Sequence, residues 1–364
     1  MQINRLKQLM IGDLAIERPI IQGGMGVGIS LSGLAAAVAN EGGVGVIATA
    51  GLGLLGPKPV GGLAAANIKR LRQEIRKARA ATKGVLGVNI MVALSNFADL
   101  AKTAVEEGID VIFSGAGLPL DLPKYLQGLR KTKLVPIVSS GRAAKLIARR
   151  WLDKYNYLPD AFVVEGPLAG GHLGFHEEQL CDPDFALEKL VPEVINEADK
   201  LEEVHQRPVP VIAAGGVYTG ADIDKYLQMG ASGVQMATRF VTTHECDAAA
   251  AFKQAYLDTR REDIVIIKSP VGLPGRVIRN DFIDQVTKGG RKPFTCPYHC
   301  IITCDFERSP YCIARALVNA QKGDLLDGFA FAGQNAYRAK EIVTVKSLMH
   351  SLVTEYEGAA HIQP

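Results

Sequence analysis

The chain has 364 residues, of which 48% are hydrophobic, and a net charge of +3 with acidic and basic residues interspersed. This length suits a single α/β barrel with insertions, and the apolar content is enough to bury a large core. The interspersed charge lacks the basic stripe that a nucleic-acid-binding protein needs. The N-terminal segment has no long apolar run, and the apolar stretch 43–55 is short and broken by glycines. We therefore expect neither signal peptide nor membrane helix, and a cytoplasmic location.

Short apolar, β-branched runs recur eight times along the chain, each followed by a polar turn and a helical pattern. Because these runs do not alternate with polar residues, they predict strands that are buried on both faces. The predicted strands are Pro19–Gln22, Val44–Thr49, Val85–Met91, Asp110–Ser114, Leu134–Ser139, Ala161–Glu165, Pro210–Ala214 and Gly233–Thr238. The helices expected between them include Ser32–Asn40, Ala65–Ala80, Phe97–Glu107, Ala143–Tyr155 and Ala221–Met229. Eight alternations favour a closed (β/α)₈ TIM barrel, with a doubly wound open sheet as the alternative.

The pattern changes after the eighth predicted strand. Cys246–Thr259 predicts the eighth helix, and a less regular stretch runs from Glu262 to Arg308. Two helical runs follow, at Ile313–Lys322 and Ala336–Glu355. We expect residues 1–260 to form the barrel and residues 261–364 to form a C-terminal, cysteine-containing helical appendage that packs on it.

Barrel enzymes place their sites in the loops that follow the strands, so these loops carry the candidate functional residues. Gly23 and Gly24 follow the first strand and would let the backbone approach a flat ligand, although a tight turn explains them equally. Asn89 lies inside the third strand, where an unpaired amide costs roughly 1–3 kcal/mol. A ligand edge or a neighbouring backbone group would satisfy it.

The loop after the sixth strand, Glu165-Gly166-Pro167-Leu168-Ala169-Gly170-Gly171-His172, is the most informative stretch of the sequence. A single histidine is more often structural than catalytic. His172, however, lies in a glycine-rich loop on the predicted active face, just after a carboxylate that ends a strand. Because histidine can take or give a proton near neutral pH, we interpret His172 as a general acid–base residue.

Glycine-rich or polar turns also follow the seventh and eighth strands, at Gly215-Gly216 and at Gln235 to Arg239. In TIM barrels these two positions commonly bind phosphate through backbone N–H groups. Thr238 could add a hydroxyl group and Arg239 a charge. The alternative is two ordinary turns, but their coincidence at both positions favours a phosphate site.

Six stretches carry a resemblance to a known family, and they occur in order over nearly the whole chain. They are IIQGGMG (20–26), GVNIMV (87–92), EGPLAGGHLG (165–174), VIAAGGV (211–217), GVQMATRF (233–240) and FAGQNAY (331–337). With these motifs the chain resembles the nitronate monooxygenase (2-nitropropane dioxygenase) and enoyl-ACP reductase II family of FMN-dependent barrels.

The resemblance implies FMN as the cofactor and His172 as the catalytic histidine. It implies that Gly23, Gly24 and Met25 contact the isoalloxazine, and that Asn89 and Glu165 hydrogen-bond flavin groups. It further implies that Gly170 and Gly171 line the site and that Gln334 folds back toward the flavin from the appendage. The residues that it assigns to the phosphate are Gly215, Gly216, Gln235, Ala237 and Thr238.

Two activities of the resembled family compete. A nitronate monooxygenase oxidises an alkyl nitronate with O₂ to a carbonyl compound and nitrite, and His172 would remove the α-proton of a nitroalkane. An enoyl-ACP reductase II uses NAD(P)H to reduce an enoyl thioester, and His172 would supply or steer a proton. The basic run between Lys69 and Arg79 could steer the acidic acyl carrier protein, although a solvated amphipathic helix is the simpler interpretation. We favour the nitronate monooxygenase activity because the wider family is named after it.

Four cysteines within one short segment depart from the resembled pattern. They are Cys296, Cys300, Cys304 and Cys312, separated by three, three and seven residues. In a reducing compartment, such a group suggests thiolate ligation of a metal or an iron–sulfur cluster, with free buried thiols or a redox pair as alternatives. On one helix the first three would form a stripe about 12 Å long, at ~1.5 Å per residue, so ligation requires a turn or loop. An oxygen-sensitive cluster would favour a reductase over an O₂-consuming enzyme.

Two further hypotheses remain open. An enzyme similar to IMP dehydrogenase would need a nucleophilic cysteine in the loop after the sixth strand, but that loop carries His172, and Cys181 lies farther on. A non-catalytic flavin-binding subunit is the alternative from another functional class. The partners we expect are a small-molecule substrate and a second copy of the chain in a homodimer.

Overall fold

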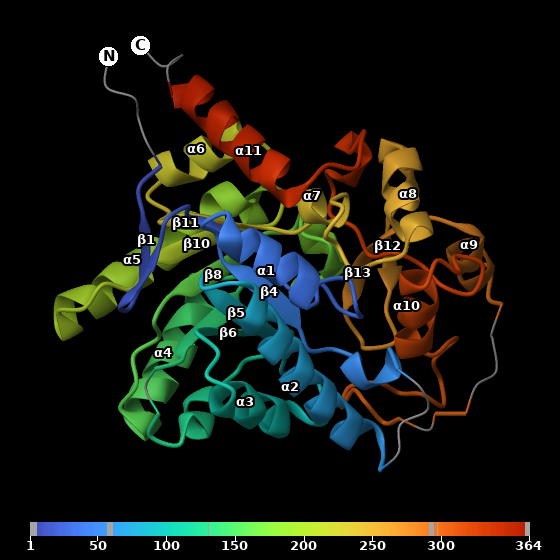
Figure 1. The fold of residues 1–364 in the computed structure, drawn as a ribbon, viewed down its shortest axis with the longest axis horizontal. Coiled ribbons are helices and arrows are strands. Elements are labelled where there is room, and N and C mark those ends of the chain that lie inside the picture. Colours follow the sequence, from blue (N-terminus) through green and yellow to red (C-terminus); the bar gives the residue numbers. More distant parts are fainter. Residues whose placement is uncertain (1–5, 57–60, 130, 291–294, 297, 361–364) are drawn as a thin grey trace.

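The computed structural model describes residues 6–56, 61–129, 131–290, 295–296 and 298–360 (Figure 1). Its centre is an eight-stranded parallel sheet in the order β3-β11-β10-β8-β7-β6-β5-β4. These strands are β3 (Ile20–Gln22), β4 (Gly45–Ala48), β5 (Leu86–Met91), β6 (Val111–Gly115), β7 (Lys133–Val138), β8 (Phe162–Glu165), β10 (Val211–Ala214) and β11 (Gly233–Met236). All eight strands therefore fall within the predicted runs or within one residue of them.

The two outer strands of this sheet meet and close it into a barrel. The N–H of Gln22 donates to the carbonyl of Val44 over 3.0 Å, and the N–H of Val44 donates to the carbonyl of Ile20 over 3.0 Å. The buried Gln22 side chain adds a further link, because its Oε1 accepts the N–H of Val46. The fold is thus an α/β TIM barrel, which confirms the closed alternative over the open sheet.

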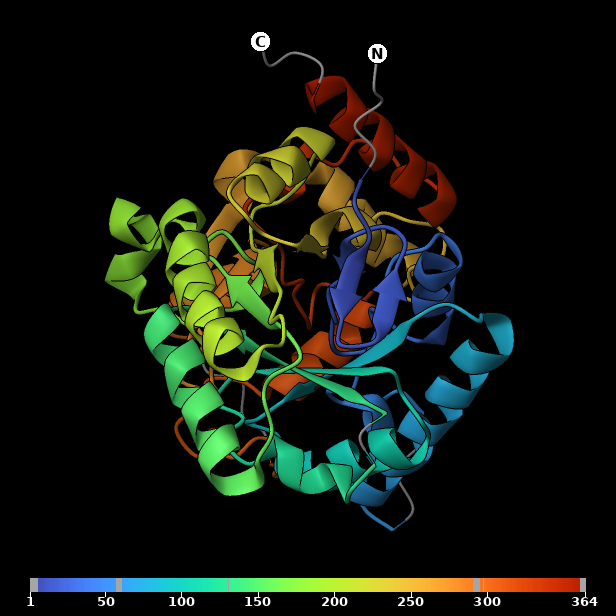
Figure 2. The same cartoon turned by 90° about the vertical axis from the view of Figure 1, so that its left-hand side faces the viewer.

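A ring of helices surrounds the strands, as Figure 2 shows. The barrel helices are α1 (Ser32–Asn40), α2 (Leu63–Ala81), α3 (Phe97–Glu106), α4 (Gly141–Tyr155), α5 (Leu187–His205), α6 (Gly220–Gln228), α7 (Thr238–Val241) and α8 (Ala250–Asp258). Side chains alternate along each strand, so that Ile112 of β6 packs toward the helices while Val111 and Phe113 fill the barrel interior. A hairpin of β1 (Leu9–Ile11) and β2 (Leu14–Ile16) adds its side chains to the interior cluster.

The chain after α8 forms additional structure beside the barrel. It contains β12 (Ile264–Lys268), β13 (Pro274–Ile278), α9 (Asp281–Thr287), α10 (Ile313–Gln321) and α11 (Val345–Ala360). The first four gather on one side of the barrel, whereas α11 lies along α6 (Figure 1). A small core of its own includes the stacked rings of Phe282 and Phe329 and the edge of Tyr311. The division of the chain at residue 260 stays a prediction.

Three predicted boundaries differ from the structure. The eighth strand ends at Met236, because Thr238 already begins α7. Residues 246–249 are not helical, and α8 begins only at Ala250. The predicted helix 336–355 is interrupted, because residues 342–344 run beside the barrel and the N–H of Val343 donates to the carbonyl of Thr242.

Within the described residues, no helix combines the length and the apolar character needed to cross a membrane.

Candidate functional site

A cavity of about 290 Å³ opens at the carboxyl ends of the barrel strands. Every residue that the sequence assigned to the flavin site lines it, although these residues come from six separate segments of the chain. They are Gly23, Gly24, Met25, Asn89, Glu165, Gly170, Gly171, His172, Gly215, Gly216, Gln235, Ala237, Thr238 and Gln334. The structure thus brings the whole predicted set together, while the role of each residue stays a prediction.

The chain needs glycine at two of these positions. Gly215 has φ of +90°, and a Cβ there would lie 2.7 Å from the carbonyl oxygen of Gly166. A Cβ on Gly170 would lie 2.5 Å from the backbone nitrogen of Gly333. The turns after β8 and β10 and the segment near residue 333 are therefore packed backbone against backbone, which fixes one wall of the cavity.

Several polar side chains that line the cavity have no hydrogen-bond partner among the described residues. Within the described residues, no hydrogen bond is made by the side chains of Asn89, Glu165, Gln235, Thr238 or Gln334. Polar groups enclosed by protein normally have partners, because an unsatisfied group costs about 1–3 kcal/mol. The lining is therefore suited to a ligand with several hydrogen-bonding groups.

His172 lies in β9 (Gly171–His172), a short strand that pairs with β13. Its Nε2 is 2.7 Å from the Oγ of Ser269, and the ring of Phe331 meets its imidazole edge-on at 4.8 Å. Ser269 Oγ also accepts the N–H of Val271, at 3.4 Å. Among the residues that the structure describes, Nδ1 has no hydrogen-bond partner, so it is the ring nitrogen available to a ligand in the cavity.

Burial sets the protonation states of the two titratable groups in the cavity. It raises the pKa of Glu165 to about 7 and lowers the pKa of His172 to about 4, because both side chains lie in a cavity enclosed by protein. His172 is therefore neutral at physiological pH and can accept a proton. Two groups with pKa values pushed apart in one cavity are typical of acid–base sites.

The loop that carries His172 is held from the C-terminal part of the chain. The buried guanidinium of Arg276, on β13, donates to the carbonyl groups of Pro167 and Ala169, each over 2.6 Å. Burial lowers the pKa of Arg276 to about 10. Sequence analysis missed the roles of Arg276 and Ser269. Both lie more than 90 residues from the loop that they contact, so no local pattern connects them with it.

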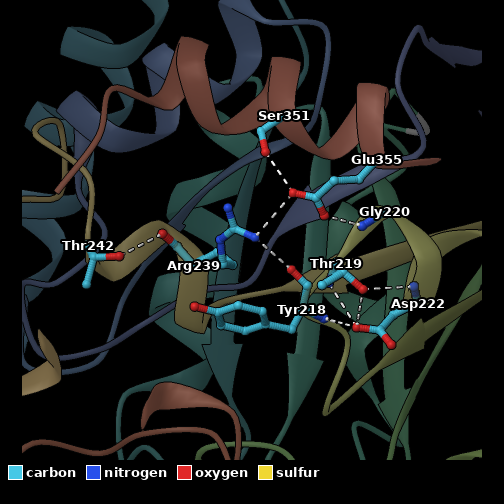
Figure 3. A network of polar contacts seen from close by, with 8 residues as sticks. All are labelled: Tyr218, Thr219, Gly220, Asp222, Arg239, Thr242, Ser351 and Glu355. Carbon is cyan, nitrogen blue, oxygen red and sulfur yellow. Dashed lines mark hydrogen bonds and ion pairs between the residues drawn. The ribbon is translucent and has the colours of Figure 1, made fainter. Parts of the chain in front are cut away.

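Arg239 does not line the cavity, although the sequence suggested that it could add charge there. It donates to the carbonyl of Tyr218 over 3.1 Å and lies 4.0 Å from Glu355, which in turn accepts the N–H of Gly220 (Figure 3). The ring of Tyr218 is also close to the guanidinium of Arg338, at 4.5 Å. Arg239 therefore supports the turn between β10 and α6 from behind, next to the predicted phosphate-binding glycines.

The cysteine segment forms another part of the cavity wall. Cys300 and Ile301 line the cavity together with Ile313, Ala314 and Leu317 of α10. The six cysteines of the chain are free. Among the described residues, no three His, Cys, Asp or Glu side chains are grouped so that they could hold a metal ion. The metal and iron–sulfur interpretations of the cysteines therefore receive no support from the part of the chain that the structure describes.

The sequence profile of the nitronate monooxygenase family matches residues 7–355. A protein of Mycobacterium tuberculosis named (3aS,4S,5R,7aS)-5-hydroxy-7a-methyl-1-oxo-octahydro-1H-indene-4-carboxyl-CoA dehydrogenase is 29% identical over 79% of this chain and 70% of its own length. A probable nitronate monooxygenase of Staphylococcus aureus is 27% identical over 78% of this chain and 81% of its own length.

Two solved structures are similar to this chain over nearly its whole length. FabK from Thermotoga maritima superposes with a TM-score of 0.71 at 29% identity, covering 95% of this chain and 94% of that one. A nitroalkane oxidase from Streptomyces ansochromogenes has the same fold, with a TM-score of 0.71 at 21% identity over 94% of this chain and 96% of its own. The family profile matches nearly the whole chain. The barrel of this chain also carries a cavity lined by every residue that the sequence assigned to the flavin site. The chain therefore belongs to the nitronate monooxygenase family and is a flavoprotein oxidoreductase.

Proposed function

We propose that the cavity binds FMN and that the chain oxidises alkyl nitronates with O₂ to a carbonyl compound and nitrite. The observation that carries the proposal is the lining itself: glycine turns after β10 and polar groups without protein partners surround one cavity. Gly215, Gly216 and Thr238 would hold the phosphate, while Asn89 and Glu165 would hydrogen-bond the ring system. A cofactor with a phosphate and a polar, flat ring satisfies both halves of this lining.

FMN, when bound, supplies the electron chemistry of the reaction. The chain supplies position and a proton acceptor. His172 is neutral because burial lowers its pKa, so its imidazole can take the α-proton of a nitroalkane and leave the nitronate. Ser269 holds Nε2 and thereby directs Nδ1 to this task.

A second candidate is the reduction of an enoyl thioester with NAD(P)H as electron donor. The observation that favours it is the apolar wall made by Ile301, Ile313 and Leu317, which suits a hydrocarbon chain better than a small nitro compound. The similarity to FabK and to a CoA-thioester dehydrogenase is consistent with such a substrate. In this reaction His172 would supply or steer a proton.

An acyl carrier protein as substrate carrier stays part of this second candidate. The basic run on α2 offers less free charge than the sequence indicates, because Arg72 and Arg76 are paired with Glu107. Arg79 is likewise paired with Asp110. We therefore expect α2 to attract an acidic carrier weakly, since paired charges steer partners less than free ones do.

Anaerobic reduction of the bound flavin distinguishes the candidates. The holoenzyme is mixed separately with NADH, NADPH and propyl nitronate, and the flavin absorbance is followed over time. Rapid reduction by propyl nitronate alone, followed by turnover with O₂, supports the nitronate activity. Rapid reduction by a nicotinamide, followed by reoxidation with an enoyl thioester, would overturn it in favour of the second candidate. Failure of every donor would leave a non-catalytic flavin-binding subunit.

A further inference from the structure

The turn that follows β10 is held at two of its carbonyl groups by side chains from other parts of the chain. We refer to residues 215–218 as the β10 turn. The Nδ2 of Asn335 donates to the carbonyl of Gly216 over 2.7 Å, and the guanidinium of Arg239 donates to the carbonyl of Tyr218 over 3.1 Å. Because a peptide group is planar, a carbonyl that is held in place also fixes the N–H of the following residue. The two hydrogen bonds therefore fix the orientation of the turn beside the cavity.

The end of the β10 turn is also held at its N–H groups. The N–H groups of Tyr218 and Thr219 donate to Oδ2 of Asp222, over 3.0 and 2.9 Å. The hydroxyl of Thr219 accepts the N–H of Asp222 in return, and the two residues form a capping box at the start of α6. Tyr218 thus has its N–H bound by Asp222 and its carbonyl bound by Arg239. A change at Arg239 would release the carbonyl and leave the capping box in place.

The side chain of Arg239 lies behind the β10 turn and does not line the cavity. Its guanidinium lies between the carbonyl of Tyr218 and the carboxylate of Glu355, which is 4.0 Å away (Figure 3). The guanidinium also lies 4.9 Å from the centroid of the Tyr218 ring. Only 19% of the Arg239 side chain is exposed, so solvent screens these contacts weakly. Arg239 therefore acts on a ligand in the cavity through the turn or through its charge, and not by contact.

Glu355, on α11, holds Arg239 in this place. Its Oε2 accepts the N–H of Gly220 over 2.8 Å, and its Oε1 accepts the hydroxyl of Ser351 over 2.7 Å. The start of α6 packs closely on α11, because a Cβ on Gly220 would lie 2.5 Å from the carbonyl oxygen of Leu352. One carboxylate of α11 thus binds the residue that begins α6 and pairs with the arginine that holds the end of the β10 turn.

Arg338 offers a comparison that separates position from charge. Its guanidinium lies 4.5 Å from the centroid of the Tyr218 ring, on which Arg239 also packs. Arg338 is exposed, and among the described residues its side chain makes no hydrogen bond to the β10 turn. Removal of either arginine takes one positive charge away from the turn. Only removal of Arg239 releases the carbonyl of Tyr218.

We propose that Arg239 is a positioning residue for the phosphate group of the bound flavin, because it holds the β10 turn through the carbonyl of Tyr218. The proposal rests on the FMN site proposed above, in which Gly215 and Gly216 hold the phosphate. The N–H groups of a turn bind an anion well only while they converge on it, so a turn that tilts loses affinity for phosphate. Arg239 therefore matters for FMN and not for riboflavin, which has the same ring system and lacks the phosphate.

Titration of the flavin-free, full-length chain with FMN and with riboflavin, followed by flavin fluorescence, tests the proposal. In Arg239→Met, which loses one charged hydrogen bond, we expect the affinity for FMN to fall about 10-fold. The affinity for riboflavin should stay within about 2-fold of wild type. Arg338→Met is the matched control and should bind both flavins as wild type does. Glu355→Gln keeps an acceptor for Gly220 but removes the charge that holds Arg239, so the affinity for FMN should fall about 3-fold.

Phosphorus nuclear magnetic resonance of the FMN-saturated protein reports on the phosphate directly. The resonance should move in Arg239→Met and in Glu355→Gln and stay in place in Arg338→Met, with the flavin absorption spectrum unchanged in all three. This readout decides the question if riboflavin binds too weakly to titrate. If circular dichroism shows that Arg239→Met is unfolded, Glu355→Gln takes its place in both experiments.

Three results would overturn the proposal. The first is an unchanged affinity for FMN and an unmoved phosphorus resonance in the Arg239 and Glu355 variants. The second is an equal loss for FMN and riboflavin, which would make Arg239 a general stabiliser of the cavity. The third is an equal loss of FMN affinity in Arg239→Met and Arg338→Met, which would assign the effect to charge alone. A wild-type chain that binds neither flavin would instead contradict the FMN site, and this role of Arg239 with it.

Discussion

His172 and Ser269 lie 97 residues apart in the chain, and their side chains meet over 2.7 Å between Nε2 and Oγ. The contact exists because β13, the strand that follows the Ser269 turn, pairs with the short strand of His172. A loop of the barrel and a hairpin of the C-terminal part thus hold the imidazole of His172 jointly. This relationship makes the C-terminal part a component of the site rather than a separate module.

Replacing His172 should abolish proton transfer while leaving the cofactor in place. We expect His172→Ala to lower kcat with a nitroalkane about 10²–10⁴-fold, which is the usual contribution of a general base. Flavin content should stay unchanged. His205→Ala, at the exposed end of α5, is the control and should keep full activity. Unchanged turnover in His172→Ala would show that His172 takes no part in proton transfer.

Ser269→Ala should reduce activity less than loss of the histidine does. Without its partner at Nε2, the imidazole can rotate, and misplacement of a catalytic group by 1 Å can cost about 100-fold in rate. We expect kcat to fall about 10-fold to 100-fold with KM little changed. Ser232→Ala changes an exposed serine at the opposite end of β11 and should be neutral. An equal effect of both variants would contradict the positioning role.

Glu165 predicts a specific pH dependence of stability in the flavin-free protein. Burial raises its pKa from 4.5 to about 7 in the folded state, so its contribution to stability is present below 4.5 and is lost as the pH rises through 7. Glu165→Gln should remove this loss. We expect the variant to gain on the order of 1–2 kcal/mol over wild type between about pH 6 and about pH 8. Urea unfolding of both proteins at the two pH values measures this difference, and parallel curves would contradict the assignment.

Arg276→Met should destabilise the protein and loosen the loop that carries His172. It removes two charged hydrogen bonds and leaves the carbonyl groups of Pro167 and Ala169 without their donor. We expect a loss of about 2–4 kcal/mol in the free energy of unfolding. Arg149→Met is the control, because the Arg149 side chain is 80% exposed. Denaturant titration compares the variants, and equal stabilities would show that Arg276 is not needed to hold the loop.

Gly215→Ala should weaken FMN binding through a clash and not through backbone strain alone. Its φ is +90°, and the new Cβ would lie 2.7 Å from the carbonyl oxygen of Gly166. Gly289 also has a positive φ, of +82°, but a Cβ there meets nothing within 4 Å. In both variants, alanine in the left-handed backbone region costs about 1–2 kcal/mol. A loss of FMN affinity of at least ~10-fold in Gly215→Ala alone would therefore come from the clash beside the cavity and not from backbone strain.

The barrel could be predicted from the sequence because its strands are buried on both faces. Runs such as Val211–Ala214 contain no polar residue, and a helical pattern follows each run, which leaves few folds to consider. The residues around the cavity could be predicted for a related reason. Most of them lie at or directly after the carboxyl ends of the strands, where a barrel brings distant segments together. Gln334 lies far from any barrel strand and could be predicted only from the family resemblance.

The remaining features depend on contacts between distant segments. Ser269 lies in a stretch without regular periodicity, so its meeting with His172 follows only from the pairing of β13 with β9. The break before α11 has a similar origin. Val343 forms a bridge with Thr243 beside the barrel, and this contact outweighs the local helical pattern.

Binding of FMN to the flavin-free chain tests the central claim most directly. Quenching of flavin fluorescence during titration gives both stoichiometry and affinity. We predict one FMN per chain, tight binding by wild type and Gly289→Ala, and weak binding by Gly215→Ala. The absence of FMN binding by wild type, or equal FMN affinity of wild type and Gly215→Ala, would contradict the assignment of this cavity to FMN.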